Sequence, residues 1–495
     1  MELKIPGLNS STTKWIWYAV LIMLNTNAMF ERVSFSPILR EMGGVLCEGG
    51  CSQSQMGFIS TFYYIVAILS SPIGGFLGDR FSKKYLLIAA LCFWSGFVLL
   101  MTFMTSYWPF VIVNGLSCAG VRLFSNMSAT IIAGLFDKES LAMLYGFYFL
   151  SVPVGIGLGM IVPESVAEAT GDWRTSLRIT PGITLFCASI IFFLLNDPPK
   201  GAGGRKEEEK ENPASFWSDL KYLISIKSYI LLVVGLTCRS FLSTILSYFG
   251  PSLFQVAARH YEDEGSLPFP VEKVARILGI FMIVGGVLGL GIGQVSNYYL
   301  GAKFYKYAPL LIGISSLLAV PTICGSLLLA DQNIIAAMVL YASFICILYA
   351  FQAWVQKISM GIILPSKRVL GNSLLTMVNT IFGSASSPFI FGSIVDWIDP
   401  TGAEDKQLEA KRLTFILGYV IFGIGGISWI LMMFFFNKDT EAVDKALQID
   451  SIKETVDIEA QKHPDVGNIT QKEKEETIEG NEADKKSGRH GINRD

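Results

Sequence analysis

The chain has 495 residues, of which 51% are hydrophobic and only 16% are charged, and its mean hydropathy is +0.47. An ordinary soluble domain is excluded, because such domains carry about 25% charged residues. The net charge of −2 offers no broad basic surface, so a nucleic-acid partner is excluded as well.

The charged residues are concentrated in two polar stretches of the chain. Segment 438–495 holds 25 of them, and segment 196–211 holds another nine. Elsewhere, uncharged runs recur that exceed the roughly 20 apolar residues an α-helix needs to cross a bilayer. The composition therefore predicts an all-α, multi-pass integral membrane protein.

Twelve transmembrane helices are predicted from the hydropathy of the chain. A connection rich in proline, glycine and charged residues separates six of them from the other six, which indicates two six-helix bundles. The predicted spans lie near 15–39, 55–78, 85–104, 110–136, 141–166, 175–195, 229–257, 272–299, 306–329, 334–361, 369–395 and 412–436.

This pattern divides the chain into five parts. Basic residues in short loops favour the cytoplasmic side, and their distribution places both termini in the cytoplasm. The tail is polar with few aromatic residues, a composition typical of disorder. The parts are a cytoplasmic N-terminus (1–14), an N-terminal bundle (15–195), a cytoplasmic linker (196–228) with a short interfacial helix at 218–227, a C-terminal bundle (229–436) and a disordered cytoplasmic tail (437–495).

Three short patterns recur in the same order in both halves. Repeated six-helix halves are typical of secondary transporters, so the repetition favours a pseudo-symmetric transporter fold. The matched motifs are Phe35-Ser36-Pro37 with Phe249-Gly250-Pro251, Gly75 and Asp79 with Gly293 and Asn297, and Pro153 and Gly157 with Pro388 and Gly392.

Cys47 and Cys51 are the two cysteines that lie in a polar loop. They are expected to form a disulfide if that loop faces an oxidising lumen or the cell exterior, and to remain thiols otherwise. The six other cysteines lie in apolar runs, where they behave as small hydrophobic residues. All three histidines lie outside the apolar runs, so we predict no metal site and no cofactor.

The loop between the second and third spans reads G-F-L-G-D-R-F-S-K-K. It resembles the signature loop of the major facilitator superfamily. The alternative is a plain positively charged cytoplasmic turn. The resemblance implies a gating motif, in which glycine lets helices approach closely and charge pairs hold the cytoplasmic side shut. Its members are Gly75, Asp79, Arg80, Lys83 and Lys84.

A longer resemblance points to one family of transporters. Residues 171–182 read G-D-W-R-T-S-L-R-I-T-P-G and are similar to the spinster pattern G-D-W-R-x-x-L-R-[VI]-T-P-G. Segments 130–136, 147–159 and 383–388 reinforce the likeness, which covers roughly 15–436. The resemblance implies a secondary active transporter, not an enzyme, that moves a lysophospholipid, sphingosine or sphingosine phosphate by alternating access. Coupling to protons stays open, because the family's acid in span four is missing from this chain. The resemblance also implies a lysosomal, endosomal or plasma membrane.

Four charged residues inside the predicted spans are the candidate substrate-binding or coupling residues, because an ion that faces lipid costs several kcal/mol. They are Glu31, Arg32, Arg122 and Arg239. The resemblance implies that Glu31 takes up a proton and that Arg32 binds an anionic lipid head, whereas a purely structural pair is the alternative. In span four the family's acid is replaced by Val121, and Arg122 follows. Arg122 either lines the cavity, neutralises Glu31 or makes a helix contact.

Two other functions stay open at the level of sequence. One is a carrier of a small organic anion, because the superfamily scaffold serves many substrates. The other is a lipid receptor that does not transport. An intramembrane enzyme is disfavoured, because the spans contain no evident nucleophile and base. The expected partners are the lipid or small-molecule substrate, protons and the surrounding lipids, and the expected state is a monomer.

Overall fold

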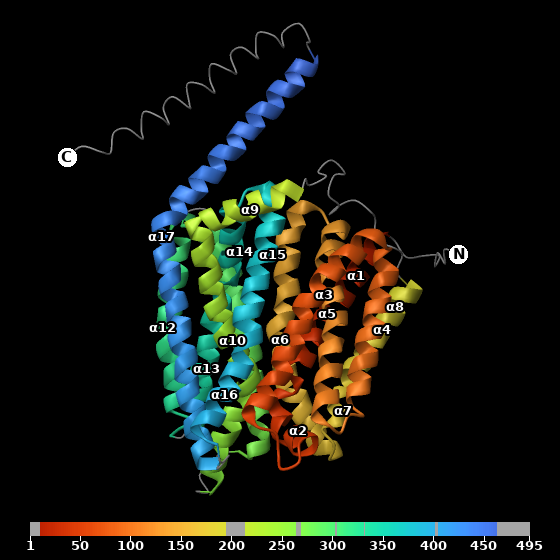
Figure 1. The fold of residues 1–495 in the computed structure, drawn as a ribbon, viewed down its shortest axis with the longest axis vertical. Helices are drawn as coiled ribbons and strands as arrows, with labels where there is room; N and C mark the ends of the chain where they lie inside the picture. The colour runs from red at the N-terminus through yellow and green to blue at the C-terminus, as the bar shows by residue number, and fades with distance from the viewer. Residues whose placement is uncertain are drawn as a thin grey trace, which may run out of the picture.

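The computed structural model consists of long α-helices that lie side by side in two groups (Figure 1). It describes residues 10–194, 213–263, 269–301, 304–330, 332–400 and 404–462. Those ranges contain no β-strand, and the predicted all-α fold is confirmed.

The N-terminal half begins with α1, which turns at its end into two short helical segments. η1 (Ser36–Ile38) and α2 (Leu39–Leu46) follow it at one end of the bundle, where α7 also lies (Figure 1). The remaining helices cross between the two ends. The bounds are α1 (Ser10–Ser34), α3 (Gln53–Arg80), α4 (Lys83–Met101), α5 (Tyr107–Leu135), α6 (Lys138–Thr170), α7 (Arg174–Leu177) and α8 (Ile179–Leu194).

The C-terminal half begins with α9, which corresponds to the interfacial helix expected at 218–227. Two of its crossings are interrupted: one breaks between α13 and α14, and another contains the π-helical segment η5. The bounds are α9 (Pro213–Ser225), α10 (Lys227–Asp263), η2 (Val271–Lys273), α11 (Val274–Leu300), η3 (Tyr305–Tyr307), α12 (Ala308–Leu328), α13 (Ile334–Ala350), α14 (Gln352–Gly361), η4 (Pro365–Lys367), α15 (Arg368–Val378), η5 (Asn379–Ala385), α16 (Ser386–Ile398) and α17 (Glu404–Lys462).

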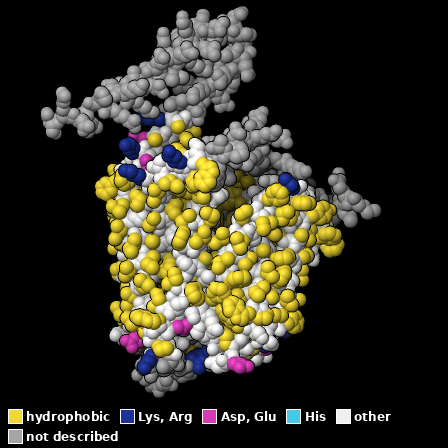
Figure 2. Space-filling view, in the orientation of Figure 1, with side chains coloured by type: hydrophobic (Ala, Val, Ile, Leu, Met, Phe, Trp, Pro, Cys, Tyr) yellow, Lys and Arg dark blue, Asp and Glu magenta, His cyan; other side chains and the backbone are white. Residues whose placement is uncertain are grey.

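Eleven helical segments of the described chain are long and apolar enough to cross a membrane. α1 has 25 residues and packs on α6 and α8, so it is the twelfth crossing, although Asn25, Asn27, Glu31 and Arg32 make it more polar. Figure 2 shows apolar side chains over the middle of the visible face and charged ones gathered toward its two ends. The predicted twelve-helix architecture is therefore confirmed, with eleven crossings that meet the length and hydropathy of a membrane span and α1 added on its length and packing.

The C-terminal helix is longer than predicted. α17 has 59 residues and continues past the membrane-crossing part to Lys462. The prediction of a disordered tail is therefore wrong for 437–462. Lys, Glu, Ala and Gln make up 12 of these 26 residues, and their high helix propensity outweighs the polar composition on which the prediction rested. Residues 463–495 lie outside the described part of the chain.

Two helix pairs join the halves, and the repeated Pro-Gly motif lies in both. α6 packs on α11, and α3 packs on α16. A Cβ atom added at Gly279 of α11 would lie 2.6 Å from the carbonyl oxygen of Gly157, and one added at Gly57 of α3 would collide with the carbonyl group of Pro388. Small residues allow backbones to approach this closely. The repeat is thus explained by close contacts between the halves.

Substitution of Gly279 by alanine is expected to destabilise the protein by about 1–3 kcal/mol, the usual effect of overpacking a tight contact. Gly291 of the same helix is the matched control, because a Cβ atom there meets nothing within 4 Å. Thermal unfolding of the two purified variants in detergent measures the difference. Equal midpoints for Gly279→Ala and Gly291→Ala would contradict the proposed close contact.

Candidate functional site

Glu31 is buried inside the N-terminal half, with 1% of its surface exposed. Its Oε2 accepts a hydrogen bond from the indole nitrogen of Trp94 at 3.0 Å, and its Oε1 accepts one from the hydroxyl of Ser117 at 3.1 Å. These donors come from α4 and α5. Within the described residues Glu31 forms no ion pair, so two neutral groups hold a buried carboxyl group.

Arg32 points in a different direction from Glu31, because consecutive helical residues lie about 100° apart around the axis. Its guanidinium group lies 5.1 Å from the centre of the Tyr64 ring. Arg32 and Tyr64 line a small polar cavity together with Ser60, Thr244 and Ser247. Because α1 and α3 belong to one half and α10 to the other, this cavity lies at the seam between the halves.

Several partners of Glu31 and Arg32 were not anticipated from sequence. Ser60 and Tyr64 are four residues apart on α3, and Thr244 and Ser247 are three apart on α10, so each pair shares one helix face. From the sequence alone, these spacings could have indicated that each helix presents a polar face. Trp94 carries no comparable signal, because an aromatic residue in an apolar helix is most often ordinary packing.

Arg122 lies half-buried on α5, one turn after Cys118. Tyr63 packs in a cluster with the same cysteine. The structure shows no ion pair between Arg122 and Glu31 in the described chain. Arg122 therefore does not neutralise the Glu31 carboxyl group directly, and the α5 residue that binds this group is Ser117.

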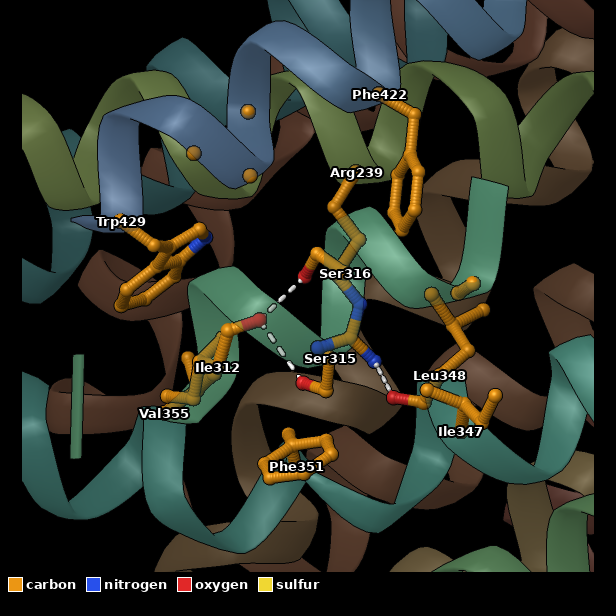
Figure 3. A pocket seen from close by; sticks show the side chains of 14 residues that line it. Arg239, Ile312, Ser315, Ser316, Ile347, Leu348, Phe351, Val355, Phe422 and Trp429 are labelled. Carbon is orange, nitrogen blue, oxygen red and sulfur yellow. Dashed lines mark hydrogen bonds between the residues drawn. The ribbon is translucent and has the colours of Figure 1, made fainter. Parts of the chain in front are cut away.

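Arg239 occupies a cavity inside the C-terminal half, among α10, α12, α13 and α17 (Figure 3). Its Nη2 donates a hydrogen bond to the carbonyl oxygen of Leu348 at 2.7 Å. Leu348 lies in the last turn of α13, whose final carbonyl groups have no partners within the helix. Arg239 thus caps a helix end. It lines a different cavity from Arg32, although both arginines lie within electrostatic range of the Tyr349 hydroxyl group.

The gating motif is described only in part. Gly75 and Asp79 lie in α3, but the surroundings of Gly75 and of the Asp79 side chain are outside the described part of the structure. Arg80 stacks its guanidinium group 4.0 Å from the centre of the Phe76 ring, and Lys84 donates to a backbone carbonyl group of α8 at 3.0 Å. Both contacts lie within the N-terminal half. The latch between the halves stays a prediction.

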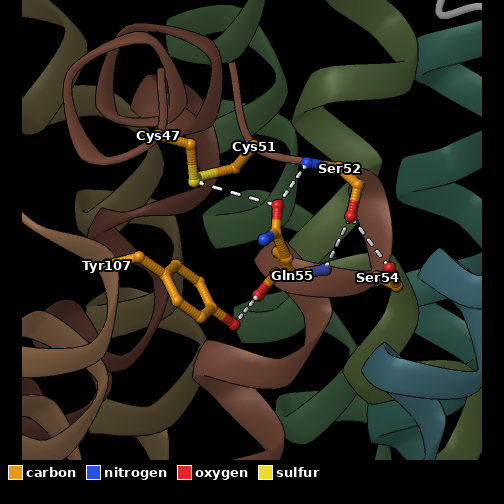
Figure 4. Close-up of a disulfide and its surroundings, with 6 residues drawn as sticks. All are labelled: Cys47, Cys51, Ser52, Ser54, Gln55 and Tyr107. Atoms are coloured by element: carbon orange, nitrogen blue, oxygen red, sulfur yellow. Dashed lines mark hydrogen bonds between the residues drawn. A yellow bond between two sulfur atoms is a disulfide. The ribbon is translucent and has the colours of Figure 1, made fainter. Parts of the chain in front are cut away.

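Cys47 and Cys51 form a disulfide just before α3 (Figure 4). Gly49 and Gly50 lie between them with φ angles of 83° and 91°, a conformation that glycine adopts at little cost. Ser52 then caps α3 through its hydroxyl group, which accepts from the backbone N–H three residues later. The disulfide and the cap together fix the start of α3 at this end of the bundle, hereafter called the disulfide end.

Asp396 of α16 binds the start of α3 across the two halves. Its Oδ1 accepts a hydrogen bond from the backbone N–H of Gln53 at 2.9 Å, and its Oδ2 accepts one from that of Ser54 at 2.8 Å. The first N–H groups of a helix lack partners within the helix and lie at the positive end of its dipole. A carboxylate of the C-terminal half therefore holds a helix of the N-terminal half.

Further contacts link the halves at the same end. The hydroxyl group of Tyr248 donates to the carbonyl oxygen of Met56 at 2.9 Å, and the Ser36 hydroxyl group donates to the Tyr248 carbonyl oxygen at 2.6 Å. Arg276 lies 3.9 Å from the carboxylate of Glu164. Figure 2 shows a recess between the bundles toward the opposite end. The halves thus meet closely at the disulfide end.

Comparison with known proteins identifies the class of the chain. The family model of the Major Facilitator Superfamily matches residues 18–363. The chain belongs to this superfamily, and it is a multi-pass membrane transporter. The predicted spinster resemblance is confirmed, because the chain is similar to spinster homolog 3 of Danio rerio (26% identical over 441 residues, 88% of each chain). It is also similar to spinster homolog 1 of Homo sapiens (27% over 445 residues, 88% of this chain and 83% of that one).

A solved structure agrees with this assignment at the level of the fold. It is the crystal structure of a bacterial homolog to the human lysosomal transporter Spinster in an inward-facing and unoccupied conformation. The two folds match with a TM-score of 0.70 at 16% sequence identity, over 87% of this chain and 99% of that one.

Proposed function

We propose that the protein moves an amphipathic lipid with a charged head group across the membrane by alternating access, coupled to protons. The observation that carries this proposal is the combination of features on α1. This helix presents a buried carboxyl group at Glu31, a cation in the seam between the halves at Arg32, and one wall of an apolar cavity.

The apolar cavity supports the lipid part of the proposal. It has a volume of about 230 Å³ and lies among α1, α6 and α8. An apolar lining gives an acyl chain surroundings as apolar as the bilayer that it leaves, so the chain enters without a hydrophobic cost. An acyl chain in this cavity would lie on the same helix that carries Arg32. The lining residues are Met23, Thr26, Asn27, Phe30, Leu158, Val162, Ile179 and Ile183.

Arg32 and Glu31 have separate tasks in this mechanism. The planar guanidinium group of Arg32 suits a phosphate or carboxylate head group, to which it can donate two parallel hydrogen bonds. Glu31 binds and releases the proton, because its carboxyl group is buried without a cationic partner in the described chain. Val121 stands in place of the family's fourth-span acid, so this proposal assigns the task to Glu31.

The contacts between the halves support an inward-facing orientation. The halves meet at the disulfide end, and disulfides persist on the oxidising side of a membrane. The disulfide end then faces the lumen or the cell exterior. α1 begins, and α17 extends beyond the bundle, at the opposite end (Figure 1), which supports a cytoplasmic position for that end of the bundle. The host membrane is lysosomal, endosomal or plasma membrane.

Flux of labelled lipids into proteoliposomes tests the proposal. We expect transport of lysophosphatidylcholine, sphingosine or sphingosine phosphate, and a loss of about tenfold or more in Arg32→Gln, since a hydrogen bond to a charged group contributes about 1.5–3 kcal/mol. Arg174→Gln is the matched control, because Arg174 also lies over an aromatic ring, at 4.9 Å from that of Trp173, but outside the seam.

Two results would overturn the lipid assignment. Uptake of a small organic acid without lipid flux would keep the superfamily and replace the substrate class. Saturable lipid binding without flux of any tested compound would indicate a receptor instead.

A further inference from the structure

Arg239 carries a charge deep within the membrane-crossing part of the C-terminal half. It lies 12 residues after Lys227, the first residue of α10, which corresponds to about 18 Å along the helix. The hydrocarbon core of a bilayer is about 30 Å thick. A guanidinium group does not lose its proton in proteins, so the positive charge persists at this depth. It therefore needs compensation inside the protein.

The four helices around Arg239 offer no carboxylate at this depth. The buried carboxyl group of Glu31 lies in the other half, where Trp94 and Ser117 bind it. Tyr349, whose hydroxyl group lies within electrostatic range of Arg239, is uncharged at neutral pH. The sequence contains no Asp or Glu over 227–261 of α10, 308–328 of α12, 334–350 of α13 and 410–438 of α17.

The end of α13 compensates only part of the charge. Its contribution is the carbonyl oxygen of Leu348, at the negative end of a helix dipole that is equivalent to roughly half an elementary charge. α14 begins at Gln352, two residues after α13 ends at Ala350, so the positive end of a second dipole lies close by. Arg239 forms this one hydrogen bond within the described chain, although a guanidinium group has five N–H donors.

The guanidinium group borders a cavity that contains a second donor without an acceptor. Trp429 of α17 lines this cavity and is 2% exposed, and its indole N–H forms no hydrogen bond within the described residues. A Cβ atom added at Gly235, one turn before Arg239 on α10, would collide with the indole nitrogen. The indole N–H therefore lies beside the helix face that carries Arg239. Because this group can only donate, it favours an occupant that accepts.

Two hydroxyl groups of α12 can turn toward the same space. Ser315 and Ser316 line the cavity, and both donate to the carbonyl oxygen of Ile312, at 2.9 and 2.7 Å. That oxygen also accepts the backbone N–H one turn later, and a hydroxyl proton rotates to suit its surroundings. Figure 3 shows the guanidinium group between these hydroxyl groups and the carbonyl oxygen of Leu348. Donors of three helices thus surround one space.

We propose that this cavity binds one chloride ion, which neutralises Arg239 and links α10, α12 and α17. The cavity has a volume of about 20 Å³, enough for one particle about the size of a water molecule and far below the size of small-molecule sites. A lipid head group is therefore excluded. A water molecule fits but leaves the charge uncompensated, whereas a weakly hydrated guanidinium group pairs readily with a monovalent anion.

Thermal unfolding of the purified full-length protein tests the site, with chloride titrated against gluconate at constant ionic strength. Gluconate is too large for the cavity. We expect a saturable rise of a few degrees in the wild type, because an ion that binds the folded protein stabilises it. Arg239→Gln is expected to lose the rise, and Arg239→Lys, which keeps the charge, is expected to retain one. Trp429→Phe keeps the ring without the N–H and should raise the half-saturating concentration about tenfold.

Lys357→Gln is the matched control. Lys357 also donates to a carbonyl oxygen just after a helix end of the same half, that of Gly301 at 3.0 Å, but it does not line the cavity. We expect this variant to keep the chloride response. Arg32→Gln is expected to keep it as well, because the site does not depend on the transport proposal, and the failure of one proposal therefore remains distinguishable from the failure of the other.

A crystal of the wild type grown with bromide in place of chloride locates the ion directly and does not depend on the folding of a variant. We expect an anomalous difference peak between Arg239 and Trp429. The proposal is overturned if the unfolding midpoint does not depend on chloride, if Arg239→Gln responds as Lys357→Gln does, or if the cavity shows no bromide peak.

Discussion

Replacement of Glu31 by glutamine is expected to abolish the response of transport to a pH gradient while the protein stays folded. Glutamine has nearly the same shape and still offers an oxygen to Trp94 or Ser117, but it cannot bind and release a proton. We expect gradient-driven lipid flux to fall by about tenfold or more, the effect of removing roughly 1.4 kcal/mol or more of coupling free energy. Flux into proteoliposomes with and without an imposed gradient measures this.

Glu41 provides the matched control for that experiment. It is an exposed residue of α2, outside the membrane-crossing segments, and partial desolvation of its carboxyl group raises its pKa above the ordinary value for glutamate. A pH response that any glutamate with a raised pKa could supply would be lost in Glu41→Gln as well. We expect this variant to keep the response. Undiminished pH dependence in Glu31→Gln would remove Glu31 from the coupling mechanism.

The architecture was predictable because it depends on local composition. A bilayer requires about 20 apolar residues for each helical crossing, so hydropathy alone locates the helices. The same reasoning isolated Glu31 and Arg32, because two adjacent charges in an apolar helix need polar surroundings. The structure supplies those surroundings, a protein interior for Glu31 and the seam between the halves for Arg32.

The partners of these charges were much less predictable, because many of them are backbone groups or residues far away in the sequence. Arg239 illustrates this, since its acceptor is a carbonyl oxygen 109 residues further along the chain. A carbonyl group has no sequence signature. Whether Arg239 caps α13 or lines the central cavity, the sequence shows the same pattern, an apolar helix that contains one arginine. Only the break after Ala350 distinguishes the two interpretations.

The contact made by Asp396 was missed for the same reason. Its acceptor oxygens bind backbone N–H groups of residues 53 and 54, more than 340 positions earlier. An acid near the end of an apolar span is usually a solvated surface residue, and nothing local distinguishes Asp396 from that case. Its role follows only from the way the two halves meet.

Substitution of Asp396 by alanine is expected to shift the protein toward a conformation open at the disulfide end. The carboxylate makes two hydrogen bonds across the halves, at 2.9 and 2.8 Å, and hydrogen bonds to charged groups contribute about 1.5–3 kcal/mol each. Loss of one such contribution changes the ratio of the two conformations by about tenfold or more. In the closed conformation, the first N–H groups of α3 would lose the Asp396 carboxylate as their acceptor. In the open conformation Asp396 is already separated from α3, so the substitution weakens the closed conformation alone.

Spin labels attached through non-natural amino acids at the exposed positions Glu48 and Lys406 report the separation of the halves at this end. We expect Asp396→Ala to add or enlarge a population at longer distance. Asp172→Asn is the matched control, because Asp172 also accepts a backbone N–H, that of Arg174 at 3.0 Å, but within one half. If both variants keep the distance distribution of the wild type, Asp396 only caps a helix, and the closure rests on the backbone contacts of α3 with α16 and of α6 with α11.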